Sequence, residues 1–240
     1  MLKNQIAWVS GWASDISLWE DDIYSAFPNF SHRFIDYFDL IPNPDDFWDN
    51  NPRIAESEIV LGWSMGTLAL LRNLHKKSAE QKWILLCPIA DFCAKGCWSV
   101  SALRATKNAI LDETTPNATE KALSLFAELM GTKGDENERW VENALRYTPE
   151  QLATGLAYLE KQIAPLSSAV TNLSSSVNAN IEGTEFRNVE LIFAELDKVV
   201  PLAQKLIFPD CISSKTIEGQ GHYLPSHFGQ LQFFIHSPQP

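Results

Sequence analysis

The pentapeptide Gly62-Trp63-Ser64-Met65-Gly66 constrains the fold of this chain more than any other segment. Residues 58–63 are an apolar run typical of a buried strand, and residues 67–74 are rich in Leu and Ala, as a helix would be. Glycines two residues to either side of the serine let a strand and a helix pass closely without a Cβ clash. The sequence therefore predicts a strand, a sharp turn that carries Ser64, and a helix.

The same alternation of strand and helix recurs along the chain. Five further apolar runs predict strands, at residues 6–10, 33–38, 82–88, 189–194 and 214–217. Helical periodicity marks residues 17–27, and an apolar helix is expected around residues 231–235, whereas residues 41–52 are rich in Pro and Asp and predict a loop. Strands that alternate with helices at this spacing favour an α/β fold with a mostly parallel sheet flanked by helices.

The rhythm changes in the second half of the chain, because residues 91–186 contain no convincing strand. Helical periodicity is found at residues 117–130, 135–147 and 149–163, and Thr148-Pro149 is typical of a helix start. Residues 167–180 are rich in Ser and Asn and predict a mobile connection. We therefore expect an α/β core formed by residues 1–90 and 187–240, with residues 91–186 inserted as a helical lid.

The spacing Gly-x-Ser-x-Gly between a strand and a helix is that of a nucleophile elbow. A serine is a poor nucleophile alone, so it needs a histidine base and a carboxylate, which follow this motif in the order acid, then histidine. Asp197 comes just after the strand at 189–194, and His222 lies in a glycine-rich loop after the next strand. Because the carboxyl ends of parallel strands meet at one edge of a sheet, we expect Ser64, Asp197 and His222 to converge as catalytic residues.

Two other acidic residues are candidates for the same position. Asp91 follows the strand at 82–88 and is the rival acid, whereas Glu195 lies two residues closer to its strand and is expected to point away from the site. No other histidine has a glycine-flanked setting, and surface or capping roles are expected for His32, His75, His227 and His236.

Attack on a carbonyl group creates an oxyanion, which needs preorganised N–H donors. One donor is expected from the backbone N–H of Met65, directly after the nucleophile. The second is expected from the backbone N–H of Trp12, in the Ser10-Gly11-Trp12-Ala13 loop after the first strand. An ordinary core aromatic is the other reading of Trp12, and both can hold.

Composition excludes several classes of function. Nineteen basic and thirty acidic residues give a formal net charge of −11, which disfavours binding to nucleic acid and to an anionic membrane. The N-terminus lacks the features of a signal peptide, and no stretch approaches the roughly 20 apolar residues of a membrane span. The four cysteines have neither disulfide-framework nor metal-site spacing. We expect a cytoplasmic monomer that acts on a small acyl ester without a metal or another cofactor.

These motifs together resemble the α/β-hydrolase superfamily, and within it the pimeloyl-acyl-carrier-protein methyl ester carboxylesterases of biotin synthesis. The elbow is similar to that family's Gly-Trp-Ser-Leu-Gly, and Ser10-Gly11-Trp12-Ala13 resembles its His-Gly-Trp-Gly loop, with Ser10 and Ala13 as departures. Other likenesses are found at Trp19, the acid turn Leu196-Asp197-Lys198-Val199-Val200-Pro201, Gly221-His222 with Pro225, and lid positions Phe126, Gly131-Thr132, Gly155-Leu156 and Leu159-Glu160.

The resemblance implies a serine esterase that removes the methyl group from a pimeloyl chain on acyl carrier protein, with Ser64 attacking, His222 moving the proton and Asp197 orienting it. The family docks this acidic carrier on basic lid residues. Residues 97–165 here carry seven basic and ten acidic side chains, so docking requires Lys107, Arg139, Arg146 and Lys161 to cluster on one face. A general carboxylesterase or thioesterase for small free esters is the alternative function, and a non-catalytic binding module with this fold is a third.

Overall fold

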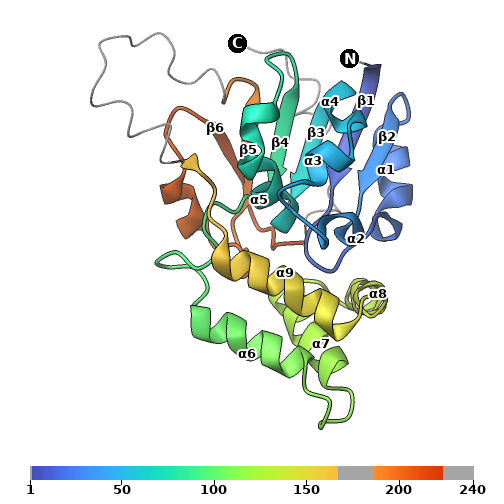
Figure 1. The fold of residues 1–240 in the computed structure, drawn as a ribbon, viewed down its shortest axis with the longest axis vertical. Helices are drawn as coiled ribbons and strands as arrows, with labels where there is room; N and C mark the ends of the chain where they lie inside the picture. The colour runs from blue at the N-terminus through green and yellow to red at the C-terminus, as the bar shows by residue number, and fades with distance from the viewer. Residues whose placement is uncertain (1, 167–185, 224–240) are drawn as a thin grey trace.

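A single parallel sheet organises the computed structural model, which describes residues 2–166 and 186–223. Its strand order is β2-β1-β3-β4-β5-β6, and all five strand pairs are parallel (Figure 1). The strands are β1 (Leu2–Val9), β2 (Ser31–Ile35), β3 (Ser57–Trp63), β4 (Lys82–Leu86), β5 (Val189–Ala194) and β6 (Ser213–Ile217). The predicted parallel sheet with flanking helices is confirmed.

The middle of the sheet is the core of the molecule. Every residue of β5 is buried, and so are the apolar residues of β3 and β4. Strands covered on both faces need continuous apolar sequence, which is why these runs were the easiest to find. The helices and short 3₁₀ segments that accompany the strands are η1 (Ile16–Leu18), α1 (Glu20–Ala26), α2 (Tyr37–Leu40), α3 (Phe47–Asn50), α4 (Arg53–Glu56), α5 (Met65–Arg72), η2 (Leu74–Lys76) and η4 (Leu202–Ile207).

Two expectations for the region after β2 are wrong. The strand predicted at 33–38 ends at Ile35, and the N–H of Asp36 then donates to the Asp39 carboxylate (3.1 Å) as α2 begins. The loop predicted at 41–52 contains α3, whose Phe47 and Trp48 are buried beneath polar neighbours. A four-residue helix is too short to show helical periodicity. Its two adjacent aromatic residues were the available sequence signal.

In the described part of the chain between β4 and β5, which omits residues 167–185, there are four helices. Three of them match the predicted segments, α7 (Ala118–Met130), α8 (Asp135–Ala144) and α9 (Pro149–Lys161). The fourth, α6 (Val100–Ile110), was missed because it buries only Leu103 and Ile110. The connection predicted at 167–180 and the helix predicted at 231–235 lie outside the described residues.

The four inserted helices lie together beyond the carboxyl ends of the strands (Figure 1). Two of them are hydrogen-bonded to the loop after β1. The indole N–H of Trp12 donates to the carbonyl of Leu152 in α9 (2.9 Å), and the indole N–H of Trp140 in α8 donates to the hydroxyl of Ser14 (3.1 Å). Within residues 2–166 and 186–223, none of the helices combines the length and apolarity that crossing a bilayer requires.

Candidate active site

Ser64 occupies a strained turn between β3 and α5. Its backbone has φ 53° and ψ −121°, in a region that side chains rarely adopt, and its side chain is 6 % exposed. A Cβ on Gly66 would lie 2.5 Å from the carbonyl oxygen of Val9, so only glycine lets the first turn of α5 approach the end of β1 this closely. The fold therefore holds the serine at the carboxyl edge of the sheet, at the start of a helix.

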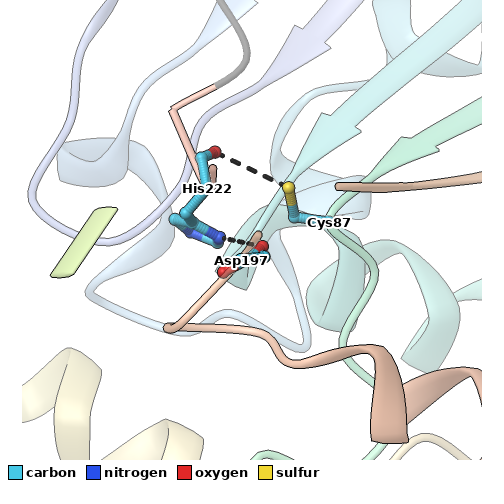
Figure 2. A group of neighbouring side chains, drawn as sticks. All are labelled: Cys87, Asp197 and His222. Carbon is cyan, nitrogen blue, oxygen red and sulfur yellow. Dashed lines mark hydrogen bonds and ion pairs between the residues drawn. The ribbon is translucent and has the colours of Figure 1, made fainter. Parts of the chain in front are cut away.

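The structure brings the three predicted side chains into one hydrogen-bonded relay. His222 Nε2 lies 2.9 Å from the hydroxyl oxygen of Ser64. His222 Nδ1 lies 2.8 Å from Asp197 Oδ2, the pair drawn in Figure 2. The other carboxylate oxygen of Asp197 accepts the backbone N–H groups of Val199 and Val200, at 2.8 and 2.7 Å. Because a carboxylate only accepts, Nδ1 carries the proton and Nε2 is left to accept the serine hydroxyl.

Burial strengthens the hydrogen bonds of this relay. Asp197 is 6 % exposed and His222 is 1 % exposed, so little water competes for their hydrogen bonds. A neutral imidazole beside a serine hydroxyl is the arrangement that removes the hydroxyl proton as the oxygen attacks a carbon atom. A carboxylate in this position can hold the ring in the required tautomer and stabilise an imidazolium.

The rival acids are held in contacts of their own. Asp91 Oδ1 accepts the N–H of Cys93 (3.0 Å), and Glu195 Oε2 accepts the N–H of Gly219 (2.8 Å). Neither makes a hydrogen bond to His222 in the part of the chain that the structure describes. Of the other histidines, His32 accepts from the indole of Trp8 and His75 is exposed, whereas residues 227 and 236 lie outside the described ranges.

The loop expected to supply an oxyanion donor lies directly against the nucleophile. A Cβ on Gly11 would lie 3.1 Å from Ser64 Cβ, so the 10–13 loop and the elbow are in contact. Across residues 2–166 and 186–223, the backbone N–H groups of Trp12 and Met65 have no hydrogen-bond acceptor. Ala13 has φ 55°, a conformation that glycine adopts more readily, so alanine at this position adds local strain.

Two residues that sequence reasoning missed hold the backbone of His222. The carbonyl of His222 accepts the indole N–H of Trp63 (3.0 Å). It also accepts the thiol of Cys87 (3.6 Å), as Figure 2 shows. Burial raises the pKa of the Cys87 thiol well above its usual range, and the Asp197 carboxylate raises it further, so the thiol stays protonated and neutral. The position of Cys87 just after β4, at the same edge of the sheet, was the available clue.

The side chains of Cys87, Asp197 and His222 also have the composition of a metal site. Their potential ligand atoms lie within 4.8 Å of one another, and all three residues are buried. Asp197 and His222 are already hydrogen-bonded to each other, and Cys87 is protonated, so an ion at this position would have to break the relay. The donor set therefore fits the relay better than a resident metal.

A pocket of about 270 Å³ opens beside the elbow. Its lining comes from the loop after α2, from one side of α9 and from Met65. Apolar contacts come from Ile41, Pro42 and Pro44, while Lys161 and Gln162 stand at the end of α9. The residue that follows the nucleophile thus contacts a space large enough for part of a small organic molecule.

Scans of the chain against protein-family models and against curated proteins find no match. Solved structures do match along nearly its full length. An esterase from Exiguobacterium antarcticum has 13% identity and a TM-score of 0.74, covering 98% of this chain and 92% of its own. An esterase from Rhodococcus sp. has 17% identity and a TM-score of 0.67, covering 98% of this chain and 90% of its own. An alpha/beta hydrolase from a deep-sea metagenome library has 12% identity and a TM-score of 0.61, covering 100% of this chain and 92% of its own. This chain has the α/β-hydrolase fold.

Proposed function

We propose that this protein is a serine hydrolase that cleaves carboxylic esters through an acyl group carried on Ser64. The observation that carries this proposal is the relay itself, with the serine hydroxyl 2.9 Å from His222 and His222 2.8 Å from Asp197 in a buried site. A binding module has no need for a base, an orienting acid and a strained nucleophile together, which disfavours the non-catalytic alternative.

The proposed reaction has two halves. His222 Nε2 takes the proton of Ser64 as the oxygen bonds to the ester carbon, and the carbonyl oxygen becomes an oxyanion facing the N–H groups of Met65 and Trp12. Collapse breaks the bond to the alkoxy group, which leaves as an alcohol with the proton from His222. Water then attacks the acyl-serine in the same way, releases the acid and restores the hydroxyl of Ser64.

The acyl intermediate gives a direct test. Rapid mixing with p-nitrophenyl acetate is expected to release p-nitrophenolate, and acid quenching during turnover is expected to leave an acetyl group on the peptide that contains Ser64. Peptide mass spectrometry checks the position. Absence of turnover across acetate, butyrate and hexanoate esters would contradict the proposal.

Small free esters are the substrate class that the surface supports best. Three of the four basic residues that a carrier protein would need already have partners in this chain. Lys107 lies 3.7 Å from Glu160, Arg146 lies 3.2 Å from Asp15, and Arg139 donates to the carbonyl of Leu18 (2.8 Å). The fourth, Lys161, is at the pocket beside Met65. A docking carrier would have to compete for these contacts.

The narrower proposal, a pimeloyl methyl ester bound to acyl carrier protein as in biotin synthesis, rests on the sequence resemblance alone. One pair of substrates separates the two proposals, namely the same methyl pimeloyl group on acyl carrier protein and on free pantetheine. We expect kcat/KM for the pantetheine ester to equal or exceed that for the carrier-bound ester, measured as methanol release. A preference of tenfold or more for the carrier-bound form would establish the narrower proposal instead.

A further inference from the structure

The hydroxyl of Tyr37 makes two hydrogen bonds to the backbone of α9. It donates to the carbonyl of Gln151 (2.6 Å) and accepts the N–H of Gly155 (3.1 Å). These two groups are residues i and i+4 of the helix, which an uninterrupted α-helix joins directly. Tyr37 has no exposed surface, and burial raises the pKa of its hydroxyl well above the usual range, so the phenol keeps the proton that it donates. The buried Tyr37 side chain thus forms hydrogen bonds at both ends of one turn of α9.

Trp12 makes the second connection to the same turn. Its indole N–H donates to the carbonyl of Leu152, the residue after Gln151, and its side chain is 3 % exposed. The loop that carries Trp12 is also tied to Tyr37 through the backbone, because Tyr37 N–H donates to the carbonyl of Ser14 (3.0 Å). The 10–14 loop, Tyr37 and α9 therefore form one closed set of contacts.

Gly155 makes this close packing possible. A Cβ at residue 155 would lie 2.3 Å from the Tyr37 hydroxyl and 2.6 Å from Trp12 Cδ1. No real Cβ tolerates either distance, so any larger residue would push α9 away from both side chains. Gly155 therefore lets the backbone of α9 contact Tyr37 and Trp12 directly.

We propose that Tyr37 is a positioning residue for catalysis, which holds α9 against Trp12 and so fixes the backbone N–H of Trp12 toward the oxyanion. This inference rests on the proposed ester hydrolysis. The N–H groups that stabilise an oxyanion act only when they are preorganised, and loss of one such donor lowers kcat by roughly 10²–10³-fold. Tyr37 touches neither the relay nor a substrate atom, so its effect passes through α9 and Trp12.

Tyr37→Phe isolates the hydroxyl, because the ring stays and only the two hydrogen bonds to Gln151 and Gly155 are lost. With p-nitrophenyl acetate we expect kcat to fall roughly tenfold, a partial loss of one donor, while KM changes less than twofold. A boronic acid forms a tetrahedral adduct on the serine, and its inhibition constant is expected to rise by the same factor as kcat falls. If the hydroxyl were merely structural, its loss would lower the melting temperature but leave kcat, KM and the inhibition constant at their wild-type values.

Tyr147→Phe is the matched control. Its ring packs edge-on against Tyr37 at 4.9 Å between centroids, is buried, and its hydroxyl has no hydrogen bond to a described residue. We expect wild-type kcat and KM for this variant. Equal losses in both variants, or an unchanged kcat in Tyr37→Phe, would overturn the role of Tyr37.

A double mutant tests the coupling between Tyr37 and Gly155. Gly155→Ala is expected to lower kcat by itself, and Tyr37→Phe removes the hydroxyl that the new methyl group meets first. The losses of the double variant should therefore be smaller than the product of the two single losses, whereas multiplicative losses would refute the shared contact. Wild-type turnover is measured in the same series. Its absence would count against the esterase, and its presence with an unaffected Tyr37→Phe would count against the positioning role alone.

Discussion

Ser64→Ala is expected to reduce kcat for p-nitrophenyl acetate by roughly 10⁴–10⁶-fold, the range of losses found when single members of an established relay are removed. His222 and Asp197 remain in place but have no hydroxyl to activate. The residual rate comes from substrate binding and from the oxyanion donors, which act without the serine. Progress curves at high enzyme concentration measure the loss.

The fold of this variant is expected to survive, which makes the loss of activity interpretable. Alanine keeps the Cβ and the strained backbone conformation at φ 53°, so the melting temperature should stay close to that of the wild type. Ser64→Gly is expected to be equally inactive but more stable, because glycine relieves the strain. A Ser64→Ala enzyme that retains more than a few per cent of wild-type turnover would mean that another group is the nucleophile.

Gly66→Ala is expected to damage both stability and activity. The new methyl group would lie 2.5 Å from the carbonyl oxygen of Val9 and 2.6 Å from that of Ser10. Backbone atoms at the end of β1 have little freedom to move, so α5 must shift outward and carry Met65 N–H with it. Overpacking of this kind costs roughly 1–3 kcal/mol, which for a chain of this size lowers the melting temperature by several degrees.

The matched control is the other glycine of the elbow. A Cβ on Gly62 would lie 2.5 Å from Leu70 Cδ1, the far end of a flexible side chain, and 3.4 Å from the backbone of Thr67. Leu70 can rotate away, so Gly62→Ala should cost less than Gly66→Ala in both melting temperature and kcat. Thermal unfolding and p-nitrophenyl acetate turnover of the two variants check this order. Equal effects would show that the close approach of α5 to β1 is not what the motif requires.

Local sequence was sufficient to single out Ser64 as the candidate nucleophile, since the apolar strand, the glycines and the helix are all within twenty residues of it. The acid was harder to assign. Asp91 and Asp197 both follow a central strand, and each accepts a backbone N–H in its own turn, from Cys93 and Val199 respectively. The two differ in which strand lies beside them. β6 pairs with β5 rather than β4, so the loop after β6 places His222 next to Asp197.

The contacts that hold the site in place were outside the reach of sequence patterns. Cys87 and Trp63 reach the carbonyl of His222 across 135 and 159 positions, and Tyr37 reaches Gln151 across 114. Periodicity reports which face of an element is buried, but it does not report which distant backbone group a buried polar side chain meets. A buried tyrosine or tryptophan needs a hydrogen-bond partner, so a partner could be expected for each of these side chains without being identified.

His222 and Asp197 are expected to make the hydroxyl of Ser64 unusually nucleophilic, and labelling with a fluorophosphonate tests this most directly. The reagent, applied to the folded protein, is expected to attach once per chain at Ser64, located by peptide mass spectrometry. His222→Ala should lower the labelling rate by orders of magnitude. Failure of the wild-type protein to be labelled, or labelling at another residue while Ser64 stays unmodified, would contradict the claim.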